Sequence, residues 1–380
     1  MKRLLFIIPS LATGGTNSSL DALYEYLRVR FDISVFAISH CPRNHKYTFD
    51  EILLPVDRVL SYSFSNYSDL KGLDKVKATW YKLLRLLFRR LQRDWDGFLE
   101  KRAVRDVRRK HTFDTVIGFQ EGSATKMASL FEEAYTIAWI HSNYDAYLDK
   151  MHSEESIYAQ FDRIVCVSEY TSSVFCRRYP SLDWKVVTVY NLINSKKVLC
   201  LGEEQIDDDR FIRKSHTFVT IGRFSEVKRF REIPSVAQYL RSRGLDFVWY
   251  IIGPSEDSVE FRSFIENSER FGVKECVKWL GGKANPYPYY KASDLYVCLS
   301  ESEACPMVFK EAQLFGLPIV TTNFPSSFEF IKGENGIIAP LAEIGEAIIS
   351  MVSRINRGME VQPETLSDSV VFNMIDKLFV

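Results

Sequence analysis

The stretch that decides the fold is Ser300-Glu-Ser-Glu-Ala-Cys-Pro-Met-Val-Phe-Lys-Glu-Ala312, in which seven residues separate Glu303 from Glu311. An apolar run at residues 294–299 precedes it and indicates a buried strand. The residues that follow predict a short helix ended by Gly316. We therefore expect the first glutamate in a loop and the second on a helix, at the sheet edge where open α/β folds bind ligands.

Length and composition set the broad class of the chain. Its 380 residues are many for one core and suit two domains. Lys plus Arg and Asp plus Glu number 49 each, and this balance argues against a dedicated nucleic-acid binder. Seven scattered cysteines without a CxxC pair fit reduced thiols in a cytoplasmic enzyme. The first apolar run, residues 4–8, is too short for a signal peptide, and no run has the length needed to span a bilayer.

Strand candidates alternate with helical patterns, which indicates βαβ units. A polar, acidic run at residues 202–209 separates two such series. We therefore expect an α/β protein with two Rossmann-like parallel-sheet domains, residues 1–192 and 193–362, followed by an amphipathic helix in residues 363–380. The strand candidates are residues 4–8, 33–38, 115–119, 136–140, 163–167 and 186–189, then 217–222, 247–252, 277–280, 295–299 and 319–322.

Two cations follow the first strand candidate of the second series, in Gly222-Arg-Phe-Ser-Glu-Val-Lys228. A glycine at a strand end lets a ligand come close to the backbone. Arg223 offers a planar fork and Lys228 a point charge, a pair suited to a diphosphate. The alternative is a solvated basic loop.

Gly14 and Gly15 stand between the first strand candidate and a helical pattern over residues 18–27. Such a turn before a helix favours an anion. The pattern is not GxGxxG, and no ribose-binding acid follows at the expected spacing, which argues against a nicotinamide cofactor. A tight turn without a ligand is the alternative.

His141 follows the strand candidate at residues 136–140, again at the expected ligand-binding edge. A purely structural histidine is the alternative. No His, Cys, Asp or Glu cluster in the sequence has the spacing of metal ligands, and a DxD motif is absent. We therefore predict no metal site.

Residues 71–110 stand apart by charge, with fourteen Lys or Arg against five Asp or Glu, a local excess of nine. Within them, residues 80–91 have apolar residues at helical spacing with arginines between. Basic amphipathic helices of this kind lie on anionic bilayer surfaces. The alternative is a helix that packs its leucines on the domain and leaves its arginines in water.

The Glu303-x7-Glu311 spacing resembles the E-x7-E signature of retaining glycosyltransferases with the GT-B fold, in particular those of family 4. The segment from Gly222 to Lys228 resembles the G-R-x-x-x-x-K segment of that group. The chain departs from the common pattern at Arg229, Ala304 and Cys305, where many relatives have glycine, glycine and an aromatic residue. The resemblance spans almost the whole chain through further stretches in the same order, at residues 165–171, 189–194, 279–282, 324–329 and 335–338.

The resemblance implies a metal-independent, hexosyltransferase-type enzyme that moves a sugar from a nucleotide-diphosphate sugar to an acceptor hydroxyl. UDP is favoured over GDP, no cofactor is expected, and the acceptor would be a carbohydrate or lipid-linked glycan in polysaccharide or glycolipid assembly. It also implies that the last helix crosses back to the first domain. The expected location is cytoplasmic, peripheral on the inner face of the cell membrane through the basic residues 71–110.

The resemblance also implies residue roles. Arg223 and Lys228 would hold the donor diphosphate, Glu303 the donor sugar and Glu311 the ribose, while His141 would lie near the transferred sugar. Further donor contacts are expected from Gly14, Gly15, Leu280, Cys305, Pro306, Met307 and Val308.

Two alternatives share this fold. A non-hydrolysing nucleotide-sugar epimerase would need no acceptor. A non-catalytic subunit that binds a nucleotide sugar is left open by the departure at Ala304 and Cys305.

Overall fold

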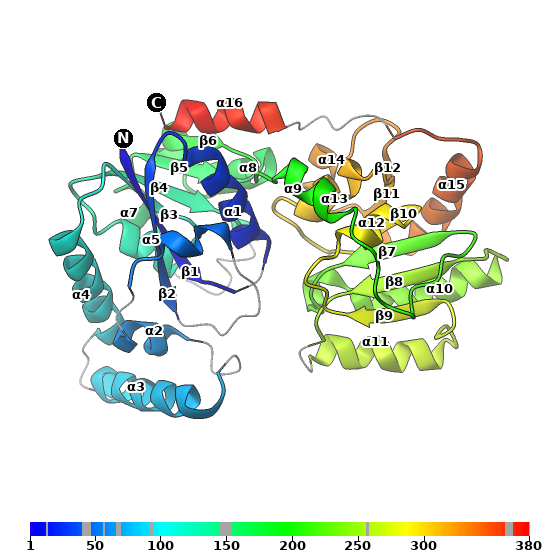
Figure 1. Cartoon of the computed structure of the whole chain (residues 1–380), viewed down its shortest axis with the longest axis horizontal. Helices are drawn as coiled ribbons and strands as arrows, with labels where there is room; N and C mark the ends of the chain where they lie inside the picture. The colour runs from blue at the N-terminus through cyan, green and yellow to red at the C-terminus, as the bar shows by residue number, and fades with distance from the viewer. Residues whose placement is uncertain are drawn as a thin grey trace. The chain divides into compact units, whose positions relative to one another are not determined.

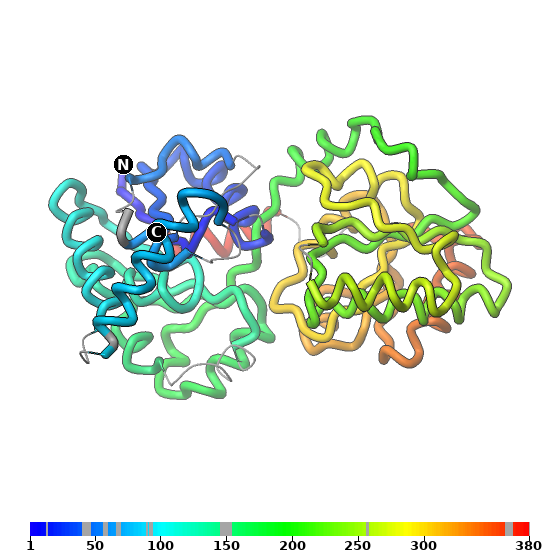
Figure 2. The backbone as a smooth tube through the Cα atoms, turned by 90° about the horizontal axis from the view of Figure 1, so that it is seen from below, coloured from blue at the N-terminus to red at the C-terminus, as the bar shows by residue number. Residues whose placement is uncertain are grey.

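The computed structural model describes residues 1–379 apart from 13, 40–46, 56–57, 66–69, 91–93, 145–153, 256–257 and 362–367. The chain divides into two compact units, Met1–Leu192 and Ile193–Val380, each built on its own sheet (Figure 1). The tube in Figure 2 shows each half of the chain closing on itself.

The first unit contains a six-stranded parallel sheet in the order β2-β1-β3-β4-β5-β6. Its strands are β1 (Arg3–Ser10), β2 (Asp32–Ser39), β3 (Thr115–Gly118), β4 (Tyr135–Ile140), β5 (Arg163–Cys166) and β6 (Val186–Thr188). Its helices are α1 (Gly15–Leu27), α2 (Arg58–Phe64), α3 (Gly72–Arg90), α4 (Trp95–Lys110), α5 (Ser123–Ala128), α7 (Glu155–Tyr158) and α8 (Glu169–Arg178), with 3₁₀ turns η1 (Thr48–Ile52) and η3 (Pro180–Lys185).

The second unit contains another six-stranded parallel sheet, in the order β12-β11-β10-β7-β8-β9. Its strands are β7 (Thr217–Ile221), β8 (Val248–Ile252), β9 (Val277–Gly281), β10 (Leu295–Cys298), β11 (Ile319–Thr322) and β12 (Gly336–Ala339). Its α-helices are α9 (Ser195–Leu201), α10 (Ile233–Ser242), α11 (Val259–Arg270), α12 (Tyr287–Lys291), α13 (Met307–Leu314), α14 (Ser327–Phe330), α15 (Ile344–Asn356) and α16 (Asp368–Leu378). The 3₁₀ turns are η4 (Glu226–Lys228), η5 (Phe230–Glu232) and η6 (Leu341–Glu343).

Both faces of the second sheet are buried, as expected for parallel strands covered by crossover helices. Trp249 and Val297 pack into one layer with the apolar sides of α10 and α15. Their neighbours Tyr250 and Tyr296 point to the opposite layer, which α12 and α13 complete. This two-sided burial explains why the strands read as continuous apolar runs rather than as alternating patterns.

Side-chain caps fix the start of several helices. Asp94 accepts the Gly97 amide at the start of α4 over 3.0 Å, and Ser258 accepts the Phe261 amide at the start of α11 over 3.1 Å. Ser168 forms a reciprocal capping box with Thr171 at the start of α8. Of the helices that the structure describes, none is long and apolar enough to cross a membrane.

The predicted α/β class with two Rossmann-like sheets is confirmed. All eleven strand candidates form strands. The structure adds β12, which the sequence indicated only as a segment after the glutamates and which lies at the edge of the second sheet. The expected final helix forms as α16, although residues 363–367 of the predicted segment lie outside the described part of the chain. Its crossing to the first domain stays a prediction.

Candidate functional site

The predicted donor residues of the second unit gather where its strand order reverses. β7 and β10 are neighbours; β8 and β9 lie to one side of them, and β11 and β12 to the other. At such a switch point, the loops at the carboxyl ends of the strands diverge and leave room for a ligand. The loop after β7 carries Arg223 and Lys228, and the loop after β10 carries Glu303.

Lys228 and Glu303 form an ion pair that joins these two loops. The Lys228 ammonium donates to Glu303 Oε1, and the Ser300 hydroxyl donates to the same oxygen over 2.8 Å. Burial acts to lower the pKa of Lys228, but the Glu303 carboxylate outweighs it and the pKa lies above its ordinary value. Lys228 is therefore a fixed cation at neutral pH.

Arg223 adds a second positive charge beside this pair. Its side chain is exposed, and within the described part of the chain no carboxylate engages its guanidinium. Its positive charge acts to lower the pKa of Lys228. Arg223 and Lys228 thus bring two positive charges to this end of the sheet, which suits the diphosphate predicted to bind there.

Glu311 lies on α13, as the sequence predicts, and its carboxylate is held by tyrosines of α12. The Tyr290 hydroxyl donates to Glu311 Oε2 over 2.8 Å, and the Tyr287 side chain interacts with the same carboxyl group. Burial raises the pKa of Glu311, while the two tyrosines and the charge of Lys228 oppose that rise. The carboxylate keeps further lone pairs for the hydroxyl groups of a ligand.

The start of α13 is a second feature suited to an anion. The helix begins at Met307 after Pro306, and no described side chain caps it. The first amides of a helix lack intrahelical partners and carry partial positive charge. Cys305 and Val308 flank this start, so the stretch predicted to contact the donor lies at the uncapped end.

Arg229 is held in the left-handed region, with φ 52°, and is the one non-glycine residue with positive φ among those described. Its guanidinium pairs with the Glu301 carboxylate over 2.7 Å. The loops after β7 and β10 are therefore joined by two ion pairs. Ala304 has an ordinary negative φ, so its replacement of glycine introduces no backbone strain.

The side chain of Leu280 belongs to the hydrophobic core of the second unit. Its side chain is buried in the layer below α12. Its carbonyl accepts a hydrogen bond from Arg210 over 2.8 Å, and Arg210 is itself paired with Asp208. A donor could thus meet only the backbone of this strand end, and the predicted contact stays a prediction.

The glycine-rich loop of the first unit lies at the corresponding switch point of its own sheet, where β1 and β3 are neighbours. Gly14 precedes α1, and a Cβ placed on it would meet no atom within 4 Å. Asn17 holds the loop by donating to the carbonyls of Ser10 and Ala12 over 2.9 and 2.8 Å. Open space at Gly14, followed by Gly15 in the first turn of α1, leaves the backbone accessible, and the donor contacts expected of the two glycines stay a prediction.

His141 lies directly after β4, beside the loop that follows β3. Its backbone amide donates to Glu121 Oε2 over 2.9 Å, and its ring contacts Phe119 with centroids 4.6 Å apart. Both ring nitrogens are buried without a hydrogen-bond partner among the described residues. Burial lowers the pKa of His141 to about 3, so the ring is neutral at pH 7. A neutral imidazole with two unused nitrogens suits hydrogen bonding to a ligand better than an ionic contact.

Three site residues were not singled out from the sequence: Ser300, Tyr290 and Gly253. A Cβ on Gly253 would come within 1.8 Å of the Gly222 carbonyl oxygen, so glycine is required where the ends of β7 and β8 meet. The available signals were the glycine after the strand candidate at residues 247–252 and the aromatic run at residues 287–290.

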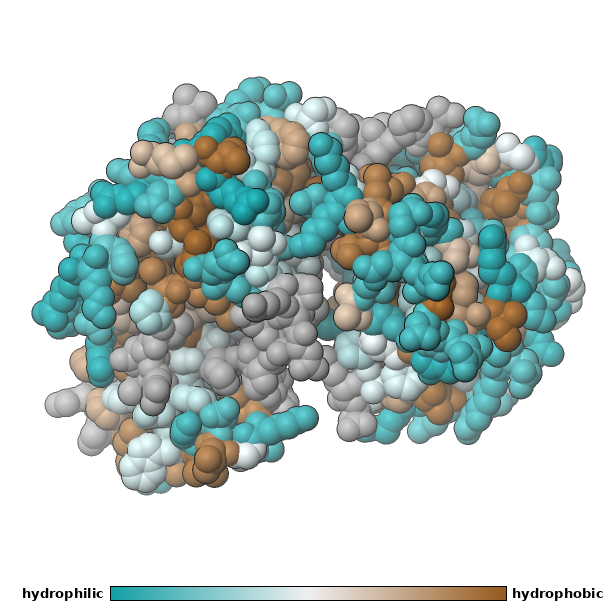
Figure 3. All heavy atoms as spheres, viewed as in Figure 1, coloured by the Kyte–Doolittle hydropathy of each residue, from teal (hydrophilic) through white to brown (hydrophobic). Residues whose placement is uncertain are grey.

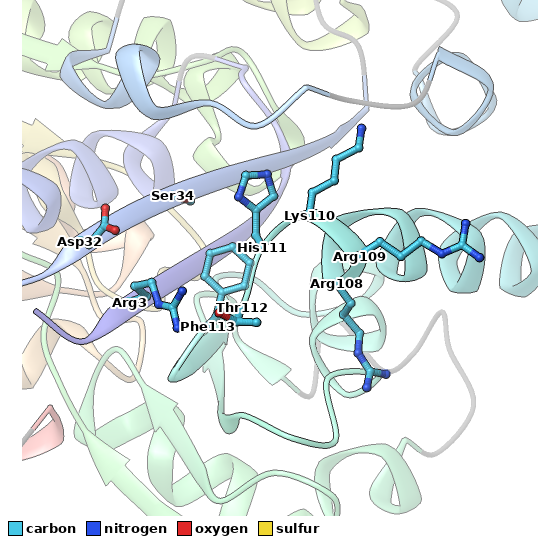
Figure 4. A pocket seen from close by; sticks show the side chains of 9 residues that line it. All are labelled: Arg3, Asp32, Ser34, Arg108, Arg109, Lys110, His111, Thr112 and Phe113. Atoms are coloured by element: carbon cyan, nitrogen blue, oxygen red, sulfur yellow. The ribbon is translucent and has the colours of Figure 1, made fainter.

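A separate pocket of about 310 Å³ lies at the opposite, amino-terminal edge of the first sheet (Figure 4). It contains none of the predicted site residues. Two of its cations are already paired: Arg108 with Glu133 over 3.0 Å, and Arg3 with Asp114 over 4.0 Å. Across the described residues, no group of three or more His, Cys, Asp or Glu is placed to hold a metal ion.

Comparison with known proteins finds a family that is similar to part of the second unit. Residues 215–354 match the family described as "Glycosyl transferases group 1", which confirms the resemblance to glycosyltransferases of that group; the retaining and family 4 assignments stay predictions.

Two curated relatives are similar over about a third of the chain. An amylovoran biosynthesis glycosyltransferase, AmsD of Erwinia amylovora, is 24% identical over 132 residues, which are 34% of this chain and 36% of the relative. A UDP-Gal:alpha-D-GlcNAc-diphosphoundecaprenol alpha-1,3-galactosyltransferase of Escherichia coli is 27% identical over 143 residues, 37% of this chain and 36% of the relative. The chain thus spans well under two thirds of their length.

Among solved structures, the chain resembles Anabaena HepE in complex with UDP, with a TM-score of 0.69 and 12% identity over 100% of this chain and 99% of that one. This similarity over the full length shows the fold alone. The chain has the GT-B fold.

Proposed function

We propose, from the glycosyl transferases group 1 match of residues 215–354 and the GT-B fold of the whole chain, that this protein is a retaining glycosyltransferase of the hexosyltransferase type, similar to family 4. It would transfer a sugar from a UDP-sugar to an acceptor hydroxyl. The observation that carries the proposal is the cluster at the β7–β10 switch point, where Arg223, Lys228, Glu303 and Glu311 come together from three separate segments.

The cluster supplies what the departure of a nucleoside diphosphate requires. As the bond between the anomeric carbon and the diphosphate oxygen breaks, negative charge grows on the leaving group. Arg223, Lys228 and the uncapped amides of α13 would stabilise that charge, and groups held in place before reaction do so most effectively. Glu311, already held by Tyr290, would accept hydrogen bonds from the ribose hydroxyls.

Glu303 would contact the donor sugar. Its carboxylate holds Lys228, so a bound donor would place Lys228 between the phosphate and Glu303. Both loops would then respond to the same ligand. The acceptor would attack from the face that the leaving group occupies, which retains the anomeric configuration, and His141 of the first unit would hydrogen-bond near the transferred sugar.

The acceptor proposal draws on the relatives. One is named for amylovoran biosynthesis and another for a diphosphoundecaprenol-linked acceptor. We propose a carbohydrate or lipid-linked glycan acceptor in polysaccharide or glycolipid assembly. The reaction would take place without a metal ion or cofactor, on the cytoplasmic side of the cell membrane with the protein held peripherally on its inner face.

The test begins with donor binding. Titration calorimetry should show UDP binding more tightly than GDP. UDP-hexoses are then incubated with undecaprenyl-diphosphate-linked N-acetylglucosamine as the probe acceptor, and the product is analysed by NMR for its anomeric configuration. A product with the donor's configuration supports the proposal. An inverted product contradicts it, and conversion of the donor alone to its epimer would identify an epimerase.

A further inference from the structure

Helix α3 exposes its apolar face to solvent. The side chains of this face keep between 50% of their surface exposed, for Leu83, and 77%, for Leu73. With 3.6 residues per turn, they cover one arc of the helix. This set is called the α3 stripe and consists of Leu73, Val76, Trp80, Leu83, Leu86 and Leu87. In Figure 3 this helix lies at the lower left, where some apolar side chains are exposed among polar ones.

The orientation of α3 is fixed by contacts on its other face. Ala78 is buried, and Tyr81 stacks on Tyr62 of α2 with ring centroids 6.3 Å apart. The Tyr62 hydroxyl donates to Asp74 over 2.7 Å.

Further along the helix, Arg85 pairs with Asp96 of α4, and Phe88 contacts Trp95 with centroids 4.3 Å apart. The alternative, a helix that packs its leucines on the domain, does not hold for Leu83, Leu86 and Leu87, because these aromatic and polar contacts turn that side of the helix outward. Neighbouring apolar side chains that are exposed together on a protein surface mark an interaction site.

Positive charge surrounds the α3 stripe. Lys75, Lys77 and Arg90 are exposed on α3, and Lys101 and Arg105 are exposed on the neighbouring α4. Residues 71–110 carry nine more basic than acidic residues, and because the whole chain is neutral, the remainder carries nine more acidic than basic ones. A second copy of this cationic helix would be repelled, whereas a surface that is apolar within and anionic at its boundary matches both features.

We propose that the α3 stripe inserts into the interface of an anionic lipid bilayer, with the flanking lysines and arginines at the phosphate level. An apolar arc carrying Trp and Leu between cationic edges has the character of an interfacial helix. This inference deepens the proposed function, since it names the surface that would bring the enzyme to a lipid-linked acceptor, and it rests on that function for its purpose. Vesicle binding is measured without any donor, so the two can fail independently.

The first experiment is flotation of the full chain with vesicles of phosphatidylcholine, with and without phosphatidylglycerol. We expect binding to the anionic vesicles at low salt. The variant Leu83→Asp with Leu87→Asp should lower the partition coefficient at least about tenfold, because two charges would enter the apolar region. Both residues are exposed, so the fold is retained. The matched control is Val29→Asp, an exposed apolar residue of the same unit, which should bind like the unchanged protein.

The second experiment measures depth. Brominated lipids should quench tryptophan fluorescence in the unchanged protein, and Trp80→Phe should lose most of that quenching while binding persists. Absence of vesicle binding, or binding equal in the Leu83→Asp and Leu87→Asp variant and the control, overturns the proposal. Concentration-dependent dimers that the same double variant abolishes would assign the stripe to a second copy and also overturn it.

Discussion

Lys228 and Glu303 are paired, so the lysine expected to hold the donor diphosphate is held by the glutamate expected to contact the sugar. The pair joins the loops that leave β7 and β10, and Ser300 donates to the same carboxylate over 2.8 Å. If Lys228 holds the diphosphate as proposed, the donor would share this lysine with Glu303. Substitutions of Lys228 and of Glu303 should therefore have different effects on UDP binding and on transfer.

Removing either cation should weaken UDP binding. We expect Arg223→Ala and Lys228→Ala each to cost about 1.5–3 kcal/mol in titration calorimetry, the scale of a charge-assisted hydrogen bond. Only Lys228→Ala should also lower the melting temperature, because it leaves the Glu303 carboxylate without its partner. Lys214→Ala, an exposed lysine of the same unit, serves as the control. Unchanged UDP affinity in both variants would remove the diphosphate assignment.

The two glutamates should separate by assay. Glu311→Gln should weaken free UDP because the carboxylate that accepts from the ribose is lost. Glu303→Gln should leave UDP affinity equal or higher, since it releases Lys228, yet reduce the transfer rate at least about tenfold. Calorimetry and a transfer assay on the same preparations compare them. Full turnover in Glu303→Gln would show that Glu303 has no role with the sugar.

Metal removal is expected to have no effect. The proposed charge stabilisation uses Arg223, Lys228 and the start of α13, so transfer should proceed in excess EDTA at the rate seen without it. The control adds Mg²⁺ or Mn²⁺ back after EDTA. Loss of activity with EDTA that either ion restores would contradict the proposed metal independence.

The strained residue Arg229 offers a test of local energetics. A left-handed arginine costs about 1 kcal/mol relative to glycine, whereas its partly exposed pair with Glu301 contributes at most about 1 kcal/mol. Arg229→Gly should therefore leave stability unchanged or slightly higher in urea unfolding. Arg229→Val should lower it by more than about 1 kcal/mol, because a branched side chain fits that backbone poorly. Glu301→Ala removes the ion pair alone and so measures its contribution to the free energy of unfolding. A large loss of stability in Arg229→Gly would mean that the ion pair contributes more than the backbone strain costs.

The sequence predicted the strands and the placement of Glu303 in a loop and Glu311 on a helix, because long apolar runs and helix-ending glycines are local signals. It could not predict that β7 and β10 are neighbours, since strand order is a long-range property. The contact between Glu303 and Lys228, which lie 75 residues apart in the chain, follows from that strand order. The sequence also could not predict which side of α3 packs on the domain. An amphipathic pattern shows that one side is apolar, but it does not show that Asp74 and Arg85 hold the other side to the domain.

Glu100 supplies a pH dependence that is independent of the site. It lies on α4 with 9% of its surface exposed, and burial raises its pKa from the ordinary 4.5 to about 7, with the charge of Lys126 opposing. The folded protein favours the protonated form of Glu100. The contribution of this group to folding stability is therefore fully present below about pH 4.5 and is lost as the pH rises through about 7.

The measurement is the difference in unfolding free energy between Glu100→Gln and the unchanged protein at several pH values. The amide cannot ionise, so the variant should gain about 2–3 kcal/mol relative to the unchanged protein between about pH 5 and pH 8.5. Glu132→Gln, an exposed position of the same unit, should give a difference that does not vary with pH. If the difference in unfolding free energy for Glu100→Gln does not vary with pH, the buried carboxyl group gains compensating solvation in the folded protein. The predicted loss of stability above neutral pH would then be wrong.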